Sequence, residues 1–168
     1  MPRVRFDELP DDGRLWVFPL SRPLEDHETD RCSSVVEAFL HQCAAHGVSL
    51  RCAHQLREGR FLLVGVDVDA EAPSGCSIDA LVGQLRTLGE ELDVTFIDHT
   101  SVWYREEDEV RTVSRTEFRS LAKVGSVSSD GSVFDTTLTR VGQARDGSLE
   151  RPARDTWHGR AFFKEEVS

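Results

Sequence analysis

The sequence lacks the features that would place this chain in a membrane or send it through one. No apolar stretch approaches the roughly 20 residues that a membrane-spanning helix needs. Residues 1–7 contain no apolar run of the kind that opens a secretory signal. We therefore expect a cytoplasmic protein with no membrane partner. A length of 168 residues is enough for one domain with a single core.

Cysteine is scarce, and its spacing excludes the common cysteine frameworks. The four cysteines include no C-x-x-C pair, and Cys32 and Cys43 share the apolar face of one expected helix. This placement favours reduced thiols in a core over a disulfide framework. The spacing C-x2-H-x5-C-x-H from Cys43 to His54 matches no standard zinc pattern, so we expect no metal site.

Lysine is scarcer still, since Lys123 and Lys164 are the only lysines among 20 basic residues. Neither follows a glycine, and no G-x-x-x-x-G-K-[ST] loop occurs anywhere in the chain. Without such a loop nothing cradles and neutralises a triphosphate. The sequence therefore argues against nucleotide hydrolysis, and we expect no cofactor.

The net charge of -10 repels phosphate backbones and anionic lipids, so we expect no nucleic-acid partner. Residues 114–168 are nearly balanced in charge, and the acidic surplus belongs to residues 1–113. Acidity combined with arginine in place of lysine resembles proteins of salt-tolerant, GC-rich bacteria. The acidic run at residues 106–109 is then most simply a solvated turn.

Hydrophobic periodicity predicts an α+β fold. Strands are expected at 15–18, 48–56, 61–66 and 94–97, and helices, each with an apolar stripe, end near 46 and 92. The order strand, helix, strand, strand, helix, strand is the ferredoxin-like (split βαβ) arrangement, with helices on one face of a mainly antiparallel sheet. A hairpin at 102–113, a short helix capped by Ser114 and a short strand at 133–138 are added. We interpret residues 1–14 as a polar arm and 142–155 as a polar linker or insertion of this single domain.

The turn Ser74-Gly75-Cys76-Ser77 carries the strongest candidate for chemistry. It joins an apolar strand to the helix that begins at about residue 78, with Ser77 as the natural N-cap. The free N–H groups of a first helical turn favour an anion and can lower a thiol pKa from about 8.5, while Gly75 lets a ligand approach the backbone. Asp79 in the same turn opposes a thiolate. A buried structural cysteine beside an ordinary cap is the alternative reading of Cys76.

Two histidines could serve as bases for Cys76. His46 ends the first helix, where free carbonyls favour its charged form, and His158 follows Trp157 near the end of the chain. Asp79 or Asp98 could orient either imidazole. The alternatives are a C-terminal histidine that bonds those carbonyls, and a Trp157 that anchors the tail to the core with His158 at the surface.

Several of these stretches together resemble a known group of proteins. They are residues 15–17, 39–47, 72–79, 96–98 and 157–158, with Ser74-Gly75-Cys76-Ser77-Ile78-Asp79 as the most specific. The chain resembles small bacterial proteins of unknown function that are often labelled "ABC transporter ATPase". The resemblance implies a shared fold and no established activity. Cys43, His99 and Thr156 depart from the tryptophan, arginine and serine usual in that group.

Two hypotheses about function remain. The first is a binding module that uses the Cys76 turn, with Ser74, Gly75, Ser77, Asp98 and Trp157, to hold a small molecule or a protein. The second is a thiol-dependent enzyme or redox protein with Cys76 as nucleophile and His46 or His158 as base. The acidic surroundings of the thiol favour the binding module.

Overall fold

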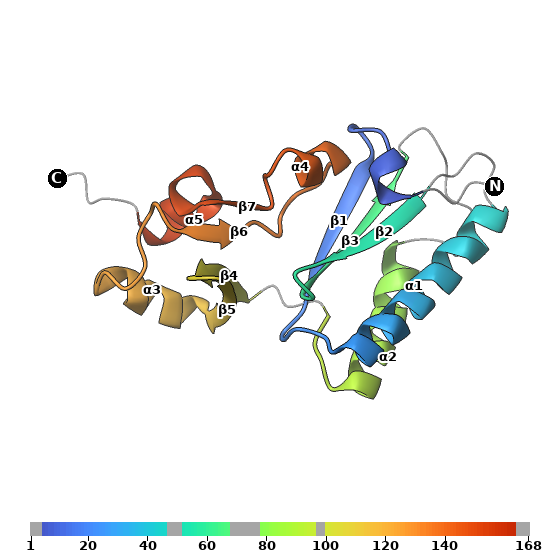
Figure 1. Cartoon of the computed structure of the whole chain (residues 1–168), viewed down its shortest axis with the longest axis horizontal. Helices are drawn as coiled ribbons and strands as arrows, with labels where there is room; N and C mark the ends of the chain where they lie inside the picture. The colour runs from blue at the N-terminus through green and yellow to red at the C-terminus, as the bar shows by residue number, and fades with distance from the viewer. Residues whose placement is uncertain (1–4, 47–51, 68–77, 97–99, 164–168) are drawn as a thin grey trace. The chain divides into compact units, whose positions relative to one another are not determined.

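The computed structural model describes residues 5–46, 52–67, 78–96 and 100–163, which form two compact units. The first unit comprises Met1–Asp98 and Thr137–Arg145, and the second comprises His99–Thr136 and Asp146–Ser168. Helices and antiparallel sheets occur together, which confirms the α+β class (Figure 1). The prediction of one folding domain stays a prediction, because this division describes packing and not independent folding.

The first unit is built on a three-stranded antiparallel sheet in the order β1-β3-β2. Its strands are β1 (Arg14–Pro19), β2 (Cys52–Arg57) and β3 (Phe61–Val66). The central strand β3 is buried from Phe61 to Gly65, as a continuous apolar run in the middle of a sheet should be. Helix α1 (Asp26–His46) and helix α2 (Ile78–Leu92) lie on the same side of this sheet (Figure 1).

The two helices bury the apolar stripes that the sequence predicts. Cys32, Val36, Leu81, Leu85 and Leu88 are all at most 2% exposed and join one core with the sheet. Helix α1 begins at Asp26, where the Glu28 carboxylate accepts a hydrogen bond from the backbone N–H of Glu25 at 3.0 Å and so caps the first turn.

The other face of this sheet is covered by short elements that the sequence analysis assigned to a polar arm and a linker. They are η1 (Phe6–Glu8) and α4 (Val141–Arg145). A Cβ on Gly65 would lie 2.6 Å from Leu9 and 3.1 Å from Val141, so this glycine permits their close approach to β3. The structure therefore differs from the expected polar arm at 1–14, because Phe6 and Leu9 within it are buried.

The elements β1, α1, β2, β3 and α2 follow the split βαβ order, with β3 antiparallel to both neighbours. A fourth strand is missing from the described sheet, since the segment from Val94 to Phe96 forms none. It instead approaches the chain beyond β1, where the Ser21 N–H donates to the Thr95 carbonyl at 2.9 Å. The ferredoxin-like order is therefore not confirmed.

The second unit contains a four-stranded antiparallel sheet in the order β5-β4-β6-β7. Its elements are β4 (Ser101–Glu106), β5 (Glu109–Ser114), α3 (Arg115–Lys123), β6 (Ser132–Phe134), β7 (Glu150–Pro152), η2 (Ala153–Asp155) and α5 (Trp157–Phe162). The predicted hairpin is β4–β5, with Ser101 opposite Ser114. Ser114 caps α3 by accepting a hydrogen bond from the Glu117 N–H at 3.0 Å, as the sequence predicts.

Residues 142–155 differ from the expected linker, because they supply most of α4 and all of β7 and η2. Strand β7 pairs with β6, with Val133 opposite Arg151. Ala144, Leu149 and Ala153 are buried along this segment. These three apolar residues pack into the core although most of the stretch is polar. Their spacing does not follow the period of a helix or of a strand, so hydrophobic periodicity did not predict the elements.

Among the described residues, no helix combines the length and the apolar character that crossing a membrane requires.

Candidate functional site

The turn proposed to carry the chemistry lies outside the described residues. Ser74, Gly75, Cys76 and Ser77 belong to the undescribed segment 68–77, and Asp98 belongs to 97–99. Helix α2 starts at Ile78, directly after the expected cap, and Asp79 in its first turn is exposed. His46 is the last residue of α1, and its side chain is outside the description.

His158 is described, and its imidazole is part of the core of the second unit. The residue is 1% exposed, and its Nδ1 lies 2.8 Å from the hydroxyl oxygen of Thr156. The same hydroxyl accepts a hydrogen bond from the His158 backbone N–H at 3.1 Å and caps α5. Burial lowers the pKa of His158 to about 4, so the ring is neutral at pH 7.

Aromatic rings surround this imidazole. The ring of Trp157 is stacked on it at 3.9 Å between centroids, and Phe118 meets it edge-on at 6.4 Å. The sequence alternative placed Trp157 as an anchor and His158 at the surface, whereas the structure buries His158 more deeply than Trp157. This environment suits packing better than proton transfer to an incoming substrate.

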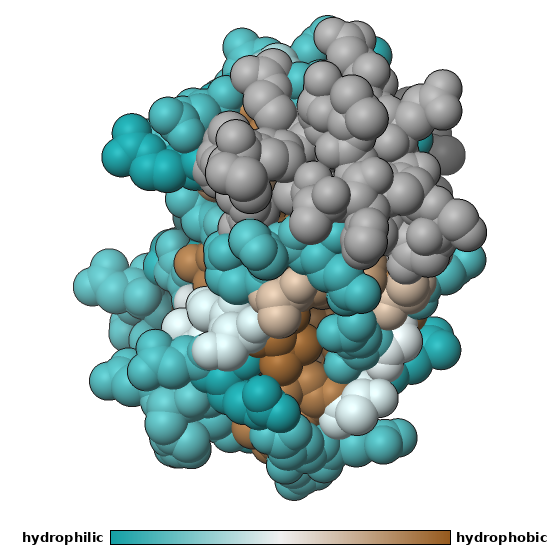
Figure 2. Space-filling view, turned by 90° about the vertical axis from the view of Figure 1, so that its right-hand side faces the viewer, coloured by the Kyte–Doolittle hydropathy of each residue, from teal (hydrophilic) through white to brown (hydrophobic). Residues whose placement is uncertain are grey.

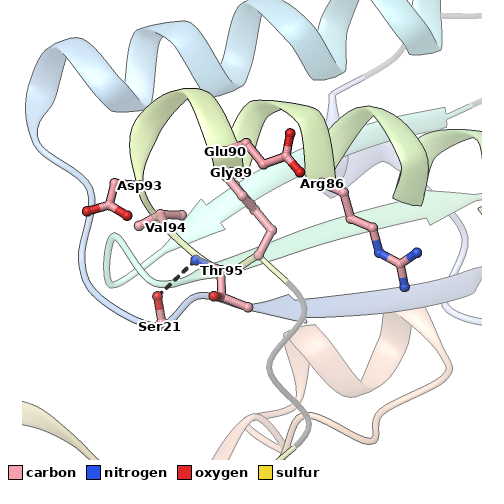
Figure 3. Close-up of a pocket in the computed structure, with 8 residues that line it drawn as sticks. Ser21, Arg86, Gly89, Glu90, Asp93, Val94 and Thr95 are labelled. Carbon is pink, nitrogen blue, oxygen red and sulfur yellow. Dashed lines mark hydrogen bonds between the residues drawn. The ribbon is translucent and has the colours of Figure 1, made fainter.

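The structure adds a pocket of about 590 Å³ that the sequence analysis did not find (Figure 3). It lies at the carboxyl end of α2, beside the segment that follows the helix and the end of β1. Its lining residues are Ser21, Arg86, Gly89, Glu90, Asp93, Val94, Thr95 and Phe96.

The pocket exists because α2 ends in a tight reversal. Asp93 adopts a left-handed φ of 59°, and the Val94 N–H donates to the Gly89 carbonyl at 2.9 Å, which is the Schellman pattern. A Cβ on Gly89 would lie 2.4 Å from the Val94 carbonyl oxygen, so only glycine fits there. The chain then returns to Ser21, whose hydroxyl oxygen accepts from the Thr95 N–H at 2.9 Å.

A partly buried ion pair holds this end of α2 in place. Arg22 donates two hydrogen bonds to the Glu28 carboxylate, at 2.9 and 2.8 Å, and a third to the Leu92 carbonyl at 2.7 Å. These hydrogen bonds lower the pKa of Glu28 to about 2. Arg22 thereby ties the Leu92 carbonyl at the end of α2 to the first turn of α1, and its charge is paired with that of Glu28.

The charged groups that line the pocket are not held by hydrogen bonds in this way, although Asp93 lies within the electrostatic reach of Arg22. Arg86, Glu90 and Asp93 are exposed, and none forms a hydrogen bond or ion pair through its side chain with any residue in the described ranges. Arg86 and Glu90 stand four residues apart on α2, yet the Arg86 side chain extends away from the Glu90 carboxylate (Figure 3). The pocket therefore offers both signs of charge to a ligand.

A second hollow lies between α1 and α2. Figure 2 views the molecule from the side of these helices and shows apolar surface between hydrophilic side chains. A groove of about 410 Å³ is lined there by Val35, Ala80, Gly83 and Leu88, among others. The Arg31 and Glu91 side chains beside it are joined by two hydrogen bonds of 2.8 and 3.0 Å, so the charges among its described lining residues are paired.

Within the described ranges, His, Cys, Asp and Glu side chains form no group of three or more that could hold a metal ion. Cys32 and Cys52 are buried thiols, and burial raises the pKa of Cys32 to about 11, while the Cys52 thiol donates to the Leu40 carbonyl at 3.8 Å.

No protein-family model, no curated protein and no solved structure matches this chain.

Proposed function

We propose that this protein is a binding module that holds a small charged ligand in the pocket at the carboxyl end of α2. One observation carries the proposal: Arg86, Glu90 and Asp93 border this space, and none of their side chains forms a hydrogen bond or an ion pair with another residue of the described ranges. Charged side chains that border a concave space are the usual means of orienting a ligand. A volume of about 590 Å³ is in the range of small-molecule sites.

The lining favours a zwitterion. The Arg86 guanidinium suits a carboxylate, because its planar donors match that group. Glu90 and Asp93 suit an ammonium group, and the negative end of the α2 dipole adds to their attraction. The hydroxyl groups of Ser21 and Thr95 supply neutral hydrogen bonds on the other wall.

Thiol chemistry has less support than binding. His158, one of the two proposed bases, is neutral and surrounded by aromatic rings. Cys76 precedes α2 while the pocket lies at its far end, and a helix of 15 residues is roughly 20 Å long. A small ligand in the pocket therefore lies at the opposite end of α2 from Ile78, where the helix begins. An enzyme built on Cys76 and His46, and ligand binding at the turn itself, stay predictions.

Amide chemical shifts can test the pocket. We expect β-alanine, a small zwitterion, to shift the amide signals of residues 89–95 in the 15N-labelled protein. Acetate and methylammonium, which carry one charge each, should shift them less. A titration to about 10 mM would nearly saturate a site with a Kd of about 1 mM.

Matched variants make this test specific. Arg86→Gln should abolish most of the β-alanine effect, because it removes the only cation of the described lining. Arg140→Gln makes the same change at an exposed arginine near the opposite end of β1 and should leave binding unchanged. The proposal fails if wild-type protein shows no shifts at residues 89–95, or if both variants bind equally well.

We also propose a cytoplasmic location and membership of the small bacterial group that the sequence resembles. The buried thiols of Cys32 and Cys52 support a reducing compartment. The group membership is supported by sequence motifs alone, of which residues 74–79 are the most specific.

A further inference from the structure

The second unit contains a smaller pocket that shares no lining residue with the pocket beside α2. Its volume is about 240 Å³, and it lies among strands β4 and β6, the β4–β5 turn and the loop that follows α3. All of its described lining residues belong to the second unit. The volume is below the roughly 300 Å³ at which drug-sized sites begin, so this pocket suits a ligand of few atoms.

Tyr104 brings an unpartnered hydroxyl group to this pocket. The residue is only 8% exposed, and its ring packs against Phe118 at 5.5 Å between centroids. The hydroxyl forms no hydrogen bond with any residue of the described ranges, yet it is not among the fully enclosed polar atoms that lack a partner. It therefore keeps contact with the pocket that Tyr104 lines. A hydrogen bond to a ligand would offset the cost of burying this group without a partner.

Three serines add further hydroxyl groups to the lining. Ser126 and Ser128 lie on the loop after α3, and Ser132 begins β6. Within the described part of the chain, none of these three hydroxyls is engaged in a hydrogen bond. A hydroxyl group can donate or accept, so these serines suit the polar end of a ligand of either kind.

The walls of this pocket are held in place. After α3, the Ser126 N–H donates to the Leu121 carbonyl at 2.9 Å, and the Ala153 N–H donates to the Gly131 carbonyl at 2.9 Å farther along the loop. Two arginine–ring contacts also hold α3 against α5, namely Arg115 over Trp157 at 5.2 Å and Arg119 over Phe162 at 5.3 Å. Walls that are fixed before binding lose little conformational entropy when a ligand enters.

The charges at this pocket favour a cation over an anion. Arg105 is the only cation of the described lining, and it donates two hydrogen bonds to the Glu150 carboxylate. Glu106 forms an ion pair with Arg111 at 3.1 Å. Glu107 also lines the pocket, but its side chain forms no hydrogen bond or ion pair with any described residue. The sequence analysis assigned this acidic run to a solvated turn, whereas the structure places one of its carboxylates beside a pocket.

From these observations we infer that the second unit binds a small primary amine with an apolar body in this pocket. The ammonium group donates to the Tyr104 hydroxyl oxygen and pairs with the Glu107 carboxylate, while the apolar body lies against Phe118 and Val127. Burial and the Glu106 carboxylate raise the pKa of Tyr104, so its hydroxyl is neutral at pH 7 and cannot itself replace a carboxylate. An anionic ligand meets no unpaired cation in the described lining.

NMR signals of the Tyr104 ring test the inference, because Tyr104 is the only tyrosine of the chain. In protein with 13C-labelled tyrosine, we expect 2-phenylethylamine to shift these ring signals together with the 15N amide signals of residues 126–132. The alcohol 2-phenylethanol and the anion 3-phenylpropionate carry the same ring and should bind at least about threefold more weakly. The inference is overturned if the amine shifts neither set of signals, if it shifts only residues 89–95, or if the anion binds as tightly.

Variants identify the groups that hold the ammonium. Tyr104→Phe should leave thermal melting unchanged, because the hydroxyl has no described partner to lose, and should weaken amine binding by about tenfold. Unweakened binding by this variant would contradict the assignment.

Glu107→Gln should weaken amine binding by about threefold, as expected for an exposed charge pair. Asp108→Asn makes the same change of charge at the next residue, which is exposed and outside the described lining, and should bind as wild type does. Equal losses in these two variants would mean that only the general charge of the turn matters, and the inference would then be wrong.

Discussion

In the first unit, helices of 21 and 15 residues cover one face of a three-stranded sheet, whereas in the second unit the helices that pack beside the sheet have only nine and six residues. The core of the first unit is rich in aliphatic side chains from regular stripes. The core of the second unit gathers Phe118 among the rings of Tyr104, Phe162 and Phe163. Long periodic elements bury area by repetition, while short ones depend on a few large contacts.

This difference predicts the largest effect for Phe118→Ala. Phe118 is 1% exposed and touches four aromatic rings, so its truncation should cost about 3–5 kcal/mol of unfolding free energy. Leu85→Ala, at a fully buried position of α2, should cost about 2–5 kcal/mol. Hydrogen exchange read separately for amides of α2 and α3 should show that each variant loosens its own unit.

Ser120→Ala, at an exposed position of α3, is the control and should leave exchange unchanged. Equal loosening of both units by Phe118→Ala would contradict the comparison. It would mean that the whole chain unfolds as one cooperative domain, as the sequence analysis expects.

The next largest effect is a difference in acid sensitivity, because the second unit should lose stability at low pH through His158. The pKa of His158 is lowered from 6.5 to about 4, so the folded state binds its proton less readily than the unfolded state does. Its stabilising contribution is present above pH 6.5 and is lost as the pH falls towards 4. Between pH 7 and pH 5 we expect the second unit to lose about 2 kcal/mol.

Urea denaturation at several pH values, followed by NMR signals of each unit, measures this loss. The imidazole signals of His158 should show no titration near pH 6.5 in the folded protein. A normal titration of that ring, or an equal acid sensitivity in both units, would show that His158 is not the buried neutral group described above.

The smallest expected changes in stability are those of alanine substitutions at two glycines of α2. Gly89→Ala places a Cβ against the Val94 carbonyl and should cost roughly 1–2 kcal/mol. Gly83→Ala meets no atom within 4 Å and should stabilise the helix by roughly 0.5–1 kcal/mol. Thermal melting distinguishes the two directions. If Gly89→Ala is as stabilising as Gly83→Ala, the reversal that forms the pocket is not rigid.

Much of the first unit could be predicted from the sequence. The stripe of Leu81, Leu85 and Leu88 and the apolar run of β3 are periodic signals, and the structure confirms both. In the second unit the β4–β5 hairpin and the Ser114 cap could also be predicted from the sequence, and the structure confirms both. Strand β7 could not be predicted, because its three residues form a strand only by pairing with β6.

The candidate site was predicted less well than the fold. The turn and the expected helix cap selected Cys76, which lies outside the described residues. The sequence also selected His158, but it gave no indication that this side chain is buried. Arg86 and Glu90 read as ordinary exposed residues of an amphipathic helix. No sequence signal near Arg86 and Glu90 predicts that Ser21 lies beside them. Ser21 is 74 residues from Thr95, and its hydroxyl oxygen accepts a hydrogen bond from the Thr95 N–H.

The sequence by itself determined the class of this protein: a lysine-poor, acidic α+β chain with no phosphate loop and with two amphipathic helices. Such properties depend on composition and on periods of two to four residues, which any local window contains. Only the tertiary structure decided the burial of His158, the pocket beside α2 and the pairing of arginines with α5 rings. Each of these three features requires contacts between side chains that are distant in the sequence. A local sequence pattern contains no information about such contacts.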